Sequence, residues 1–143
     1  ALSKLIAETL VGTGVEVFAL QTGLSSGGID LGSSSLVPLR TPQVMMFGGM
    51  GTSATDVGEI WHMLDTRFNM PVSIVDVERF SNINIARYNV IVMPSGSYTN
   101  LGKPAQDKLR EWISGGGTLI ATEDATKWLA GNGFTKTVFR TSV

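Results

Sequence analysis

Apolar and polar residues follow two different rhythms from Gln43 onward. Short apolar runs bounded by turn residues are typical of strands buried on both faces, whereas apolar residues three or four positions apart indicate helices. Because the two kinds of segment alternate, the pattern predicts a three-layer α/β fold, an open parallel sheet with helices on both faces. The predicted strands are 44–47, 72–77, 90–93 and 118–122, and the predicted helices are 54–68, 105–113 and 125–129. Helix 54–68 is expected to bury one apolar face, made of Val57, Ile60, Trp61, Leu64 and Phe68.

The first 41 residues have a different pattern. Helical spacing of leucine and isoleucine predicts a helix within 2–12, and the run Val15–Leu20 predicts a buried strand. The Gly- and Ser-rich stretch 23–35 predicts a loop or weak hairpin. The composition changes near residue 42, so we expect a partial connecting segment over 1–41 and an α/β domain over 42–143. The chain begins at Ala1 without Met, and we expect it to be cut from a longer protein.

Composition narrows the classes of function. The chain has 143 residues, 43% of them apolar, which is enough for one domain with a core of its own. The net charge is −1 and no basic stripe is present, so we expect no nucleic-acid partner. No apolar run has the length of a membrane span. With no cysteine and only His62, we expect neither a cysteine nucleophile nor a metal site in this chain.

A glycine-rich turn precedes the predicted helix 54–68. Gly49, Gly51 and Ala54 fit the pattern G-x-G-x-x-A, and Asp76 ends the next predicted strand, where an acid binds ribose in dinucleotide-binding folds. This arrangement would make the chain a nucleotide-binding enzyme domain. The alternative is a structural turn in which Thr52 or Ser53 caps the helix through its hydroxyl, and we favour this alternative.

Other polar side chains also follow predicted strands. Ser95 and Ser97 come after strand 90–93, and Glu123 and Asp124 come after strand 118–122. Carboxylates at such a position act as general bases or metal ligands, or they stabilise a helix N-terminus through the helix dipole. The carboxyl ends of parallel strands share one edge, where α/β folds bind ligands. The candidate lining of a ligand site at this edge is therefore Gly49, Gly51, Thr52, Ser95, Ser97, Glu123 and Asp124.

Several stretches together resemble the C-terminal part of bacterial zinc carboxypeptidase-family proteins. They are TPQVMMF at 41–47, EIWHMLD at 59–65, FNMPVS at 68–73, DV at 76–77, NIN at 82–84, YNVIVMP at 88–94, LREWI at 109–113 and GGGTL at 115–119. In that family a class I glutamine amidotransferase-like domain follows the peptidase domain, and the segment joining the two is similar to the first 40 residues here. The resemblance implies a flavodoxin-like or amidotransferase-like fold and a covalently linked upstream peptidase domain.

The same resemblance implies an accessory role. The family's zinc and catalytic residues belong to the peptidase domain, so the expectation is a non-catalytic domain that packs on that peptidase or binds peptide or cell-wall substrate. The setting implied is periplasmic or extracellular, because such proteins are usually exported. No cofactor is expected in this chain, and zinc is expected in the parent metallocarboxypeptidase, a hydrolase.

Glu123 occupies a special place in this resemblance. In amidotransferases the turn after the corresponding strand holds the nucleophilic cysteine on a strained backbone. If that elbow persists here, we expect unusual torsions at Glu123 and a partly buried carboxylate, with a raised pKa unless hydrogen bonds stabilise the charge. If it has decayed, we expect ordinary torsions and an exposed side chain. A third function left open is a hydrolase that uses Glu123 as its base.

Overall fold

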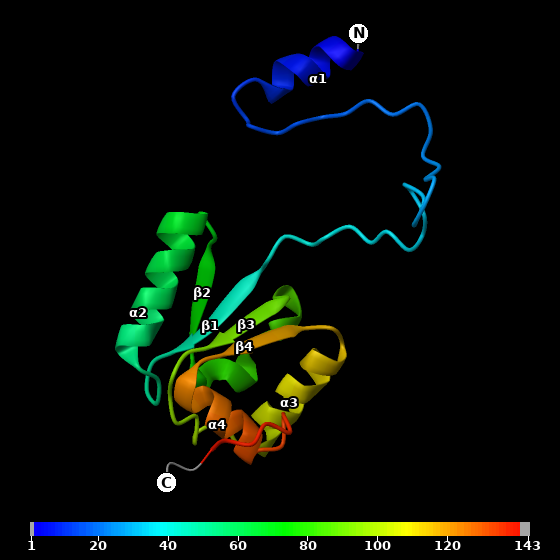
Figure 1. Cartoon of the computed structure of the whole chain (residues 1–143). Coiled ribbons are helices and arrows are strands. Elements are labelled where there is room, and N and C mark those ends of the chain that lie inside the picture. Colours follow the sequence, from blue (N-terminus) through cyan, green and yellow to red (C-terminus); the bar gives the residue numbers. More distant parts are fainter. Residues whose placement is uncertain (1, 141–143) are drawn as a thin grey trace. The chain divides into compact units, whose positions relative to one another are not determined.

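The computed structural model describes residues 2–140 and divides into two compact units after Arg40 (Figure 1). The first unit contains one helix, α1 (Leu2–Leu10), whose surface carries an ion pair between Lys4 Nζ and Glu8 Oε1 at 3.8 Å. No described side chain in residues 2–40 is buried. After α1 the backbone forms turns, one of them closed by Leu31 N donating to Gly23 O at 2.8 Å.

The strand predicted over Val15–Leu20 is absent from this unit, and that prediction is wrong. An apolar run becomes a strand only when a neighbouring strand takes its N–H and C=O groups. No such neighbour lies within the described part of the first unit, and Val15, Val17, Phe18 and Leu20 are all exposed. The predicted helix and Gly/Ser-rich loop are both confirmed.

The second unit is built on a four-stranded sheet in the order β2-β1-β3-β4 (Figure 1). The strands are β1 (Val44–Gly48), β2 (Val72–Asp76), β3 (Val90–Met93) and β4 (Thr118–Ala121). All three pairings are parallel, and Val44 aligns with both Val72 and Val90. The predicted α/β class is confirmed, and the sheet is an open parallel sheet of the flavodoxin-like kind.

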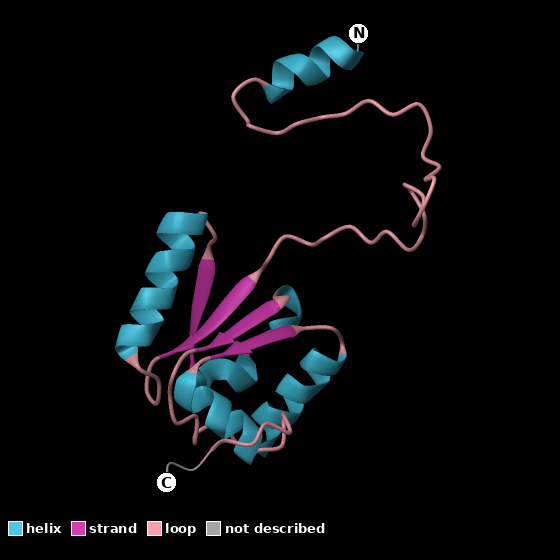
Figure 2. Cartoon of the chain, viewed as in Figure 1, coloured by secondary structure: helices cyan, strands magenta, loops and turns pink. Residues whose placement is uncertain are grey.

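Helices cover both faces of this sheet (Figure 2). Helix α2 (Ala54–His62) lies on one face and continues as a single stretch of π-helix, Met63–Arg67. Helices α3 (Lys103–Ser114) and α4 (Glu123–Gly131) lie on the other face with the 3₁₀-helical turns Val77–Asn82 and Ile85–Arg87. The sequence pattern missed the two 3₁₀-helical turns because each is too short to show a helical period.

Each strand sends alternate side chains to the two faces, and this sorts the core. Met45 and Phe47 point to the α3 and α4 side, where Phe47 packs against Phe80 with ring centroids 4.9 Å apart. Val44 and Met46 point to the α2 side. The α3 side is fixed further by Lys108, whose Nζ donates to the carbonyls of Phe80, Ser81 and Ile83 at 3.1, 2.9 and 2.5 Å.

Helix α2 buries a narrower face than predicted. Val57, Ile60 and Leu64 pack on the sheet as expected, but Trp61 is 41% exposed and Phe68 is 62% exposed. Trp61 lies at the margin of the stripe that these three residues define. Phe68 follows the π-helical stretch, which adds residues per turn and so rotates the later positions away from the sheet. No helix within residues 2–140 is both long and apolar enough to cross a membrane.

Candidate ligand-binding site

The sheet has a point where its connections diverge. After β1 the chain passes to α2 on one face, and after β3 it passes to α3 on the other face. β1 and β3 are neighbours, so the two loops that follow them separate above the sheet edge. Open α/β sheets bind ligands in the crevice at such a point.

The two loops are joined by their backbones. Thr52 and Gly96 form an antiparallel bridge, Ser53 N donates to Ser95 O at 2.8 Å, and Ser97 N donates to Gly51 O at 2.9 Å. A Cβ on Gly96 would stand 2.4 Å from the Gly51 carbonyl oxygen, so only glycine allows this approach. The loops after β1 and β3 therefore act as one connected surface.

The start of α2 confirms the structural interpretation of the glycine-rich turn. Ser53 is the N-cap: its Oγ accepts from Asp56 N at 3.3 Å and donates to Asp56 Oδ1 at 2.8 Å. Thr52 Oγ1 donates instead to Gly49 O at 2.8 Å. The carboxylate of Asp56 thus lies in the first helical turn, where the helix dipole stabilises a negative charge.

The structure brings together Gly49 and Asp76, the two ends of the possible dinucleotide motif. A Cβ on Gly49 would stand 2.5 Å from Asp76 Oδ1, and the same carboxylate pairs with Arg79 at 3.6 Å. However, α2 begins at Ala54, so Gly51 is separated from the first helical residue by the paired residues Thr52 and Ser53. The amides that would hold a pyrophosphate at a helix start are partly engaged in the loop pairing.

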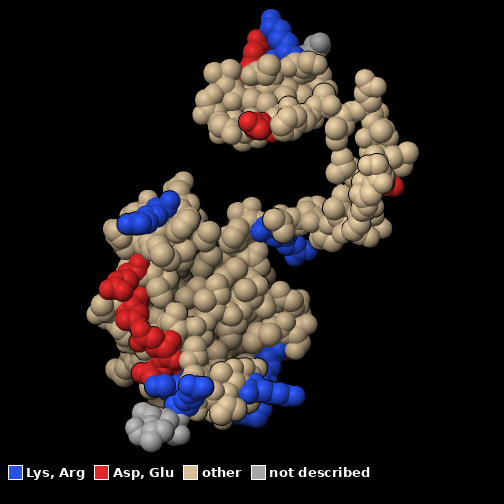
Figure 3. Space-filling model, viewed as in Figure 1, with Lys and Arg blue, Asp and Glu red and all other residues tan. Residues whose placement is uncertain are grey.

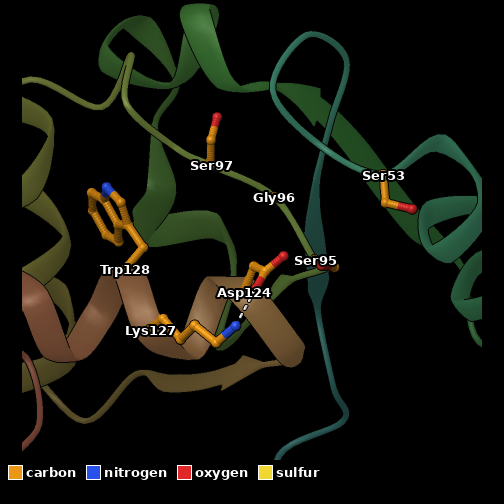
Figure 4. Close-up of a pocket in the computed structure, with 7 residues that line it drawn as sticks. All are labelled: Ser53, Ser95, Gly96, Ser97, Asp124, Lys127 and Trp128. Atoms are coloured by element: carbon orange, nitrogen blue, oxygen red, sulfur yellow. Dashed lines mark hydrogen bonds and ion pairs between the residues drawn. The ribbon is translucent and has the colours of Figure 1, made fainter. Parts of the chain in front are cut away.

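A cleft of about 510 Å³ opens beside these loops (Figure 4). Its volume falls within the range of about 300–1,000 Å³ common for small-molecule sites. Ser95 is 7% exposed and is the buried polar residue of this region. Across from the loops, Asp124 Oδ1 and Lys127 Nζ form an ion pair at 2.8 Å, which raises the pKa of Lys127. The lining consists of Ser53, Ser95, Gly96, Ser97, Asp124, Lys127 and Trp128.

The turn from β4 into α4 keeps part of the expected elbow. Glu123 has a φ of 45°, in the left-handed region that a residue with a Cβ rarely adopts, so the prediction of unusual torsions is confirmed. The expected partial burial is wrong, because Glu123 is exposed. Glu123 is already the first residue of α4, and a first-turn side chain at the start of a surface helix extends into solvent.

The residue before Glu123 has an unsatisfied polar group. Thr122 N donates to Met93 O at 3.0 Å, which anchors the turn on β3. Its side-chain oxygen, Thr122 Oγ1, is buried and has no hydrogen-bond partner among the described residues. A strained residue and an unpaired buried hydroxyl therefore stand next to each other at the end of β4.

The predicted site residues divide into three groups. Ser95, Ser97 and Asp124 line the cleft, whereas Gly51 and Thr52 support it by pairing with the loop after β3. Gly49 lies instead against Asp76, and Glu123 is not part of the lining.

The sequence analysis missed four lining residues. Lys127 and Trp128 lie three and four positions after Asp124, the spacing that places side chains on one helix face, so this spacing was the available signal. Ser53 is predicted only as a helix cap, and Gly96 carries no side chain that would mark it as a lining residue.

Neither metal-binding clusters nor similarity to known proteins assigns a function to the cleft within the described residues. Within residues 2–140, no three His, Cys, Asp or Glu side chains lie close enough together to share a metal ion. Comparisons with protein-family models, with curated proteins and with solved structures found no match to this chain. The site is therefore interpreted from its own geometry.

Proposed function

We propose that this chain is a non-catalytic accessory domain of a zinc carboxypeptidase-family protein, and that its cleft binds substrate for a peptidase domain outside this sequence. The observation that carries the proposal is the position of the cleft, at the switch point between β1 and β3. Its walls supply groups suited to binding: serine hydroxyls, an indole and a mutually neutralised ion pair. The Asp124 carboxylate is already engaged by Lys127 Nζ at 2.8 Å.

The parent protein is part of the same proposal. The sequence resemblance supports an upstream peptidase domain that holds the zinc, a hydrolase activity in that domain, and a periplasmic or extracellular setting. The substrates proposed for the cleft are peptide or cell-wall material. A gene that encodes an H-x-x-E motif with a later histidine upstream of this chain would support the parentage, and a gene that lacks both would contradict it.

The binding role is tested by nuclear magnetic resonance on the isotopically labelled chain. A soluble cell-wall fragment that carries both its sugars and its peptide is titrated into the protein. We expect the largest shift changes at the amides of 95–97 and 124–128, which line the cleft. The glycine and serine amides of 23–35 serve as the internal control because they belong to the other unit. Shifts spread evenly over the chain, or no shifts, would contradict the proposal.

A nucleotide-binding enzyme domain is the second candidate, and the contact between Gly49 and Asp76 favours it. The Asp56 carboxylate in the first turn of α2 opposes it, because a phosphate there would meet a negative charge. Calorimetric titration with NAD and ATP separates the two candidates. Micromolar binding that disappears in Gly51→Val would establish the nucleotide site in preference to our proposal.

The strained backbone at Glu123 keeps a hydrolase function open as a third candidate. It predicts turnover of small esters or amides that is lost in Glu123→Gln. The exposed position of Glu123 outside the cleft lining does not favour it, because a general base works best where water is excluded.

A further inference from the structure

We propose that the cleft takes a neutral, hydroxyl-rich ring, that is, one unit of a saccharide, with Trp128 as its stacking surface. This inference rests on the proposed binding function and names the class of ligand. Three features of the cleft carry it: the balance of charge, the fixed indole, and the hydroxyl groups on the opposite wall.

The two charged residues of the cleft lining, Asp124 and Lys127, neutralise each other. Lys127 is the basic residue of the lining, and Asp124 already pairs with it. Asp56 and Glu123 stand at the starts of the two adjacent helices, and both are acidic. Figure 3 shows acidic side chains gathered along one side of the second unit, and helix α2 contains two acidic residues, Asp56 and Glu59. A phosphate or carboxylate would be repelled, so a neutral ligand fits best.

Trp128 is held in place from behind. Its indole packs against Tyr98 with ring centroids 6.0 Å apart and against Phe134 at 5.8 Å. Phe134 is itself fixed, because Phe134 N donates to Leu129 O at 2.9 Å and the Arg110 guanidinium lies 3.9 Å from the ring centroid. The half-buried indole therefore presents a rigid apolar surface to the cleft (Figure 4). The C–H face of a sugar ring stacks on such a surface at little entropic cost.

The opposite wall offers polar groups at fixed positions. The backbones of Ser95 and Ser97 are held by the loop after β1, while their hydroxyls make no hydrogen bond to another residue within 2–140. Ser95 is a buried residue that lines the cleft, so a ligand hydroxyl there would meet a polar side chain without a protein partner among the described residues. A serine hydroxyl both donates and accepts, and it therefore matches the hydroxyls of a sugar in either sense.

The test compares two halves of the cell-wall ligand. A peptide-free oligosaccharide of N-acetylglucosamine and a sugar-free stem peptide are each titrated into the chain by nuclear magnetic resonance. We expect the oligosaccharide to bind and to shift the amides of 95–97 and 124–128. Binding of the peptide alone at the cleft would overturn the saccharide inference and leave the binding function standing. Binding of neither would overturn both.

Matched variants locate the stacking surface. Trp128→Leu should weaken oligosaccharide binding by about tenfold or more, and Ser97→Ala should weaken it several-fold. Trp61→Leu is the control, because Trp61 is 41% exposed on α2 and is not part of the cleft lining. Should Trp128→Leu impair folding, Ser97→Ala still decides, since Ser97 is exposed. Two results would place the sugar elsewhere and overturn the inference. One is equal oligosaccharide affinity in Ser97→Ala and the unmodified chain, and the other is an equal loss of affinity in Trp128→Leu and Trp61→Leu.

Discussion

The turns after β1 and after β4 both pass through left-handed backbone, but they do so with different residues. The turn after β1 uses Gly49 and Gly51, with φ of 80° and 91°. The turn after β4 uses Glu123, with φ of 45°, beside the Thr122 hydroxyl, which has no partner within residues 2–140. Glycine adopts such torsions freely, whereas a residue with a Cβ loses roughly 1–2 kcal/mol there.

The turn after β1 is therefore unstrained, whereas the turn after β4 stores backbone strain. In the turn after β1, each unusual torsion coincides with a glycine, and the loop is held to the loop after β3 by backbone hydrogen bonds with Ser95 and Ser97. In the turn after β4, the sequence keeps a geometry that its residues do not favour. Strain of this kind persists when the surrounding structure determines it, and it gathers at functional sites. Here it borders the cleft, because Asp124 follows Glu123 directly.

The largest expected effect is at Gly49. Gly49→Ala places a Cβ at φ 80° and 2.5 Å from Asp76 Oδ1, so we expect the free energy of unfolding to fall by about 2–3 kcal/mol. Chemical denaturation measures the change. Gly58→Ala is the control, because Gly58 lies inside α2 and a Cβ added there would meet no atom of a neighbouring segment within 4 Å, so alanine should stabilise by about 0.5–1 kcal/mol. Equal stability of Gly49→Ala and the parent chain would show that the turn is not built around glycine.

The second effect is at Tyr98, in the loop after β3. Tyr98 is buried, and its hydroxyl donates to Pro94 O at 2.6 Å. Tyr98→Phe leaves that carbonyl without its partner and should cost about 1–2 kcal/mol, measured by chemical denaturation. Burial, and then the charge of Asp56, raise the pKa of Tyr98 above its usual value.

The raised pKa gives the Tyr98 prediction a pH signature. The unfolded chain loses the tyrosine proton above about pH 10, while the folded chain retains it. Stability from this group is therefore complete below that pH and is lost as the pH rises above it. Tyr98→Phe should flatten the alkaline part of the stability curve. The exposed residues Thr99 and Asn100 offer neutral control substitutions in the same loop. An unchanged alkaline slope in Tyr98→Phe would contradict the burial of this hydroxyl.

How far the sequence predicted the fold depends on the kind of interaction. The strands and helices of the second unit were found because their apolar patterns reflect burial inside one compact sheet. Val15–Leu20 has an equally apolar pattern but no neighbouring strand in its unit, and a sequence pattern does not reveal a missing neighbour. The turn Val77–Asn82 was missed because it is too short to show a helical period, and the contact of its carbonyls with the distant Lys108 leaves no local signal in the sequence.

The sequence predicted the lining residues that directly follow strands, but it missed those that lie on a helix. Ser95, Ser97 and Asp124 follow strands, so the topology of a parallel sheet places them at one edge. Lys127 and Trp128 line the same cleft from the first turns of α4. Whether their side chains face the cleft depends on how that helix packs against the sheet. Glu123 is exposed because α4 begins at that residue. A sequence pattern locates the start of a helix only to within one or two residues, so it does not predict this exposure.

A smaller effect is expected beside the strained turn, at Thr122. Thr122→Val keeps the shape of the side chain and removes a buried hydroxyl that has no partner among the described residues, so stability should rise by about 1 kcal/mol. Thr118→Val is the control at the other end of β4, because Thr118 is exposed and should change little. Thermal denaturation of both variants gives the comparison. A loss of stability in Thr122→Val would mean that the hydroxyl is satisfied.

The smallest effect is expected at Glu123 itself. Glu123→Gly relieves the left-handed strain, but glycine also gains freedom in the unfolded chain, so the net rise should be only about 0.5 kcal/mol. The substitution also removes the Glu123 carboxylate, which the helix dipole stabilises in the first turn of α4, so the measured change in stability combines two effects. Glu123→Ala removes the same carboxylate and keeps the Cβ, so the difference between the two variants isolates the strain. We expect the glycine variant to be the more stable by about 1 kcal/mol in thermal denaturation. Equal stability of the two variants would show that the backbone at residue 123 relaxes without cost. The turns after β1 and β4 would then differ in their residues but not in backbone strain.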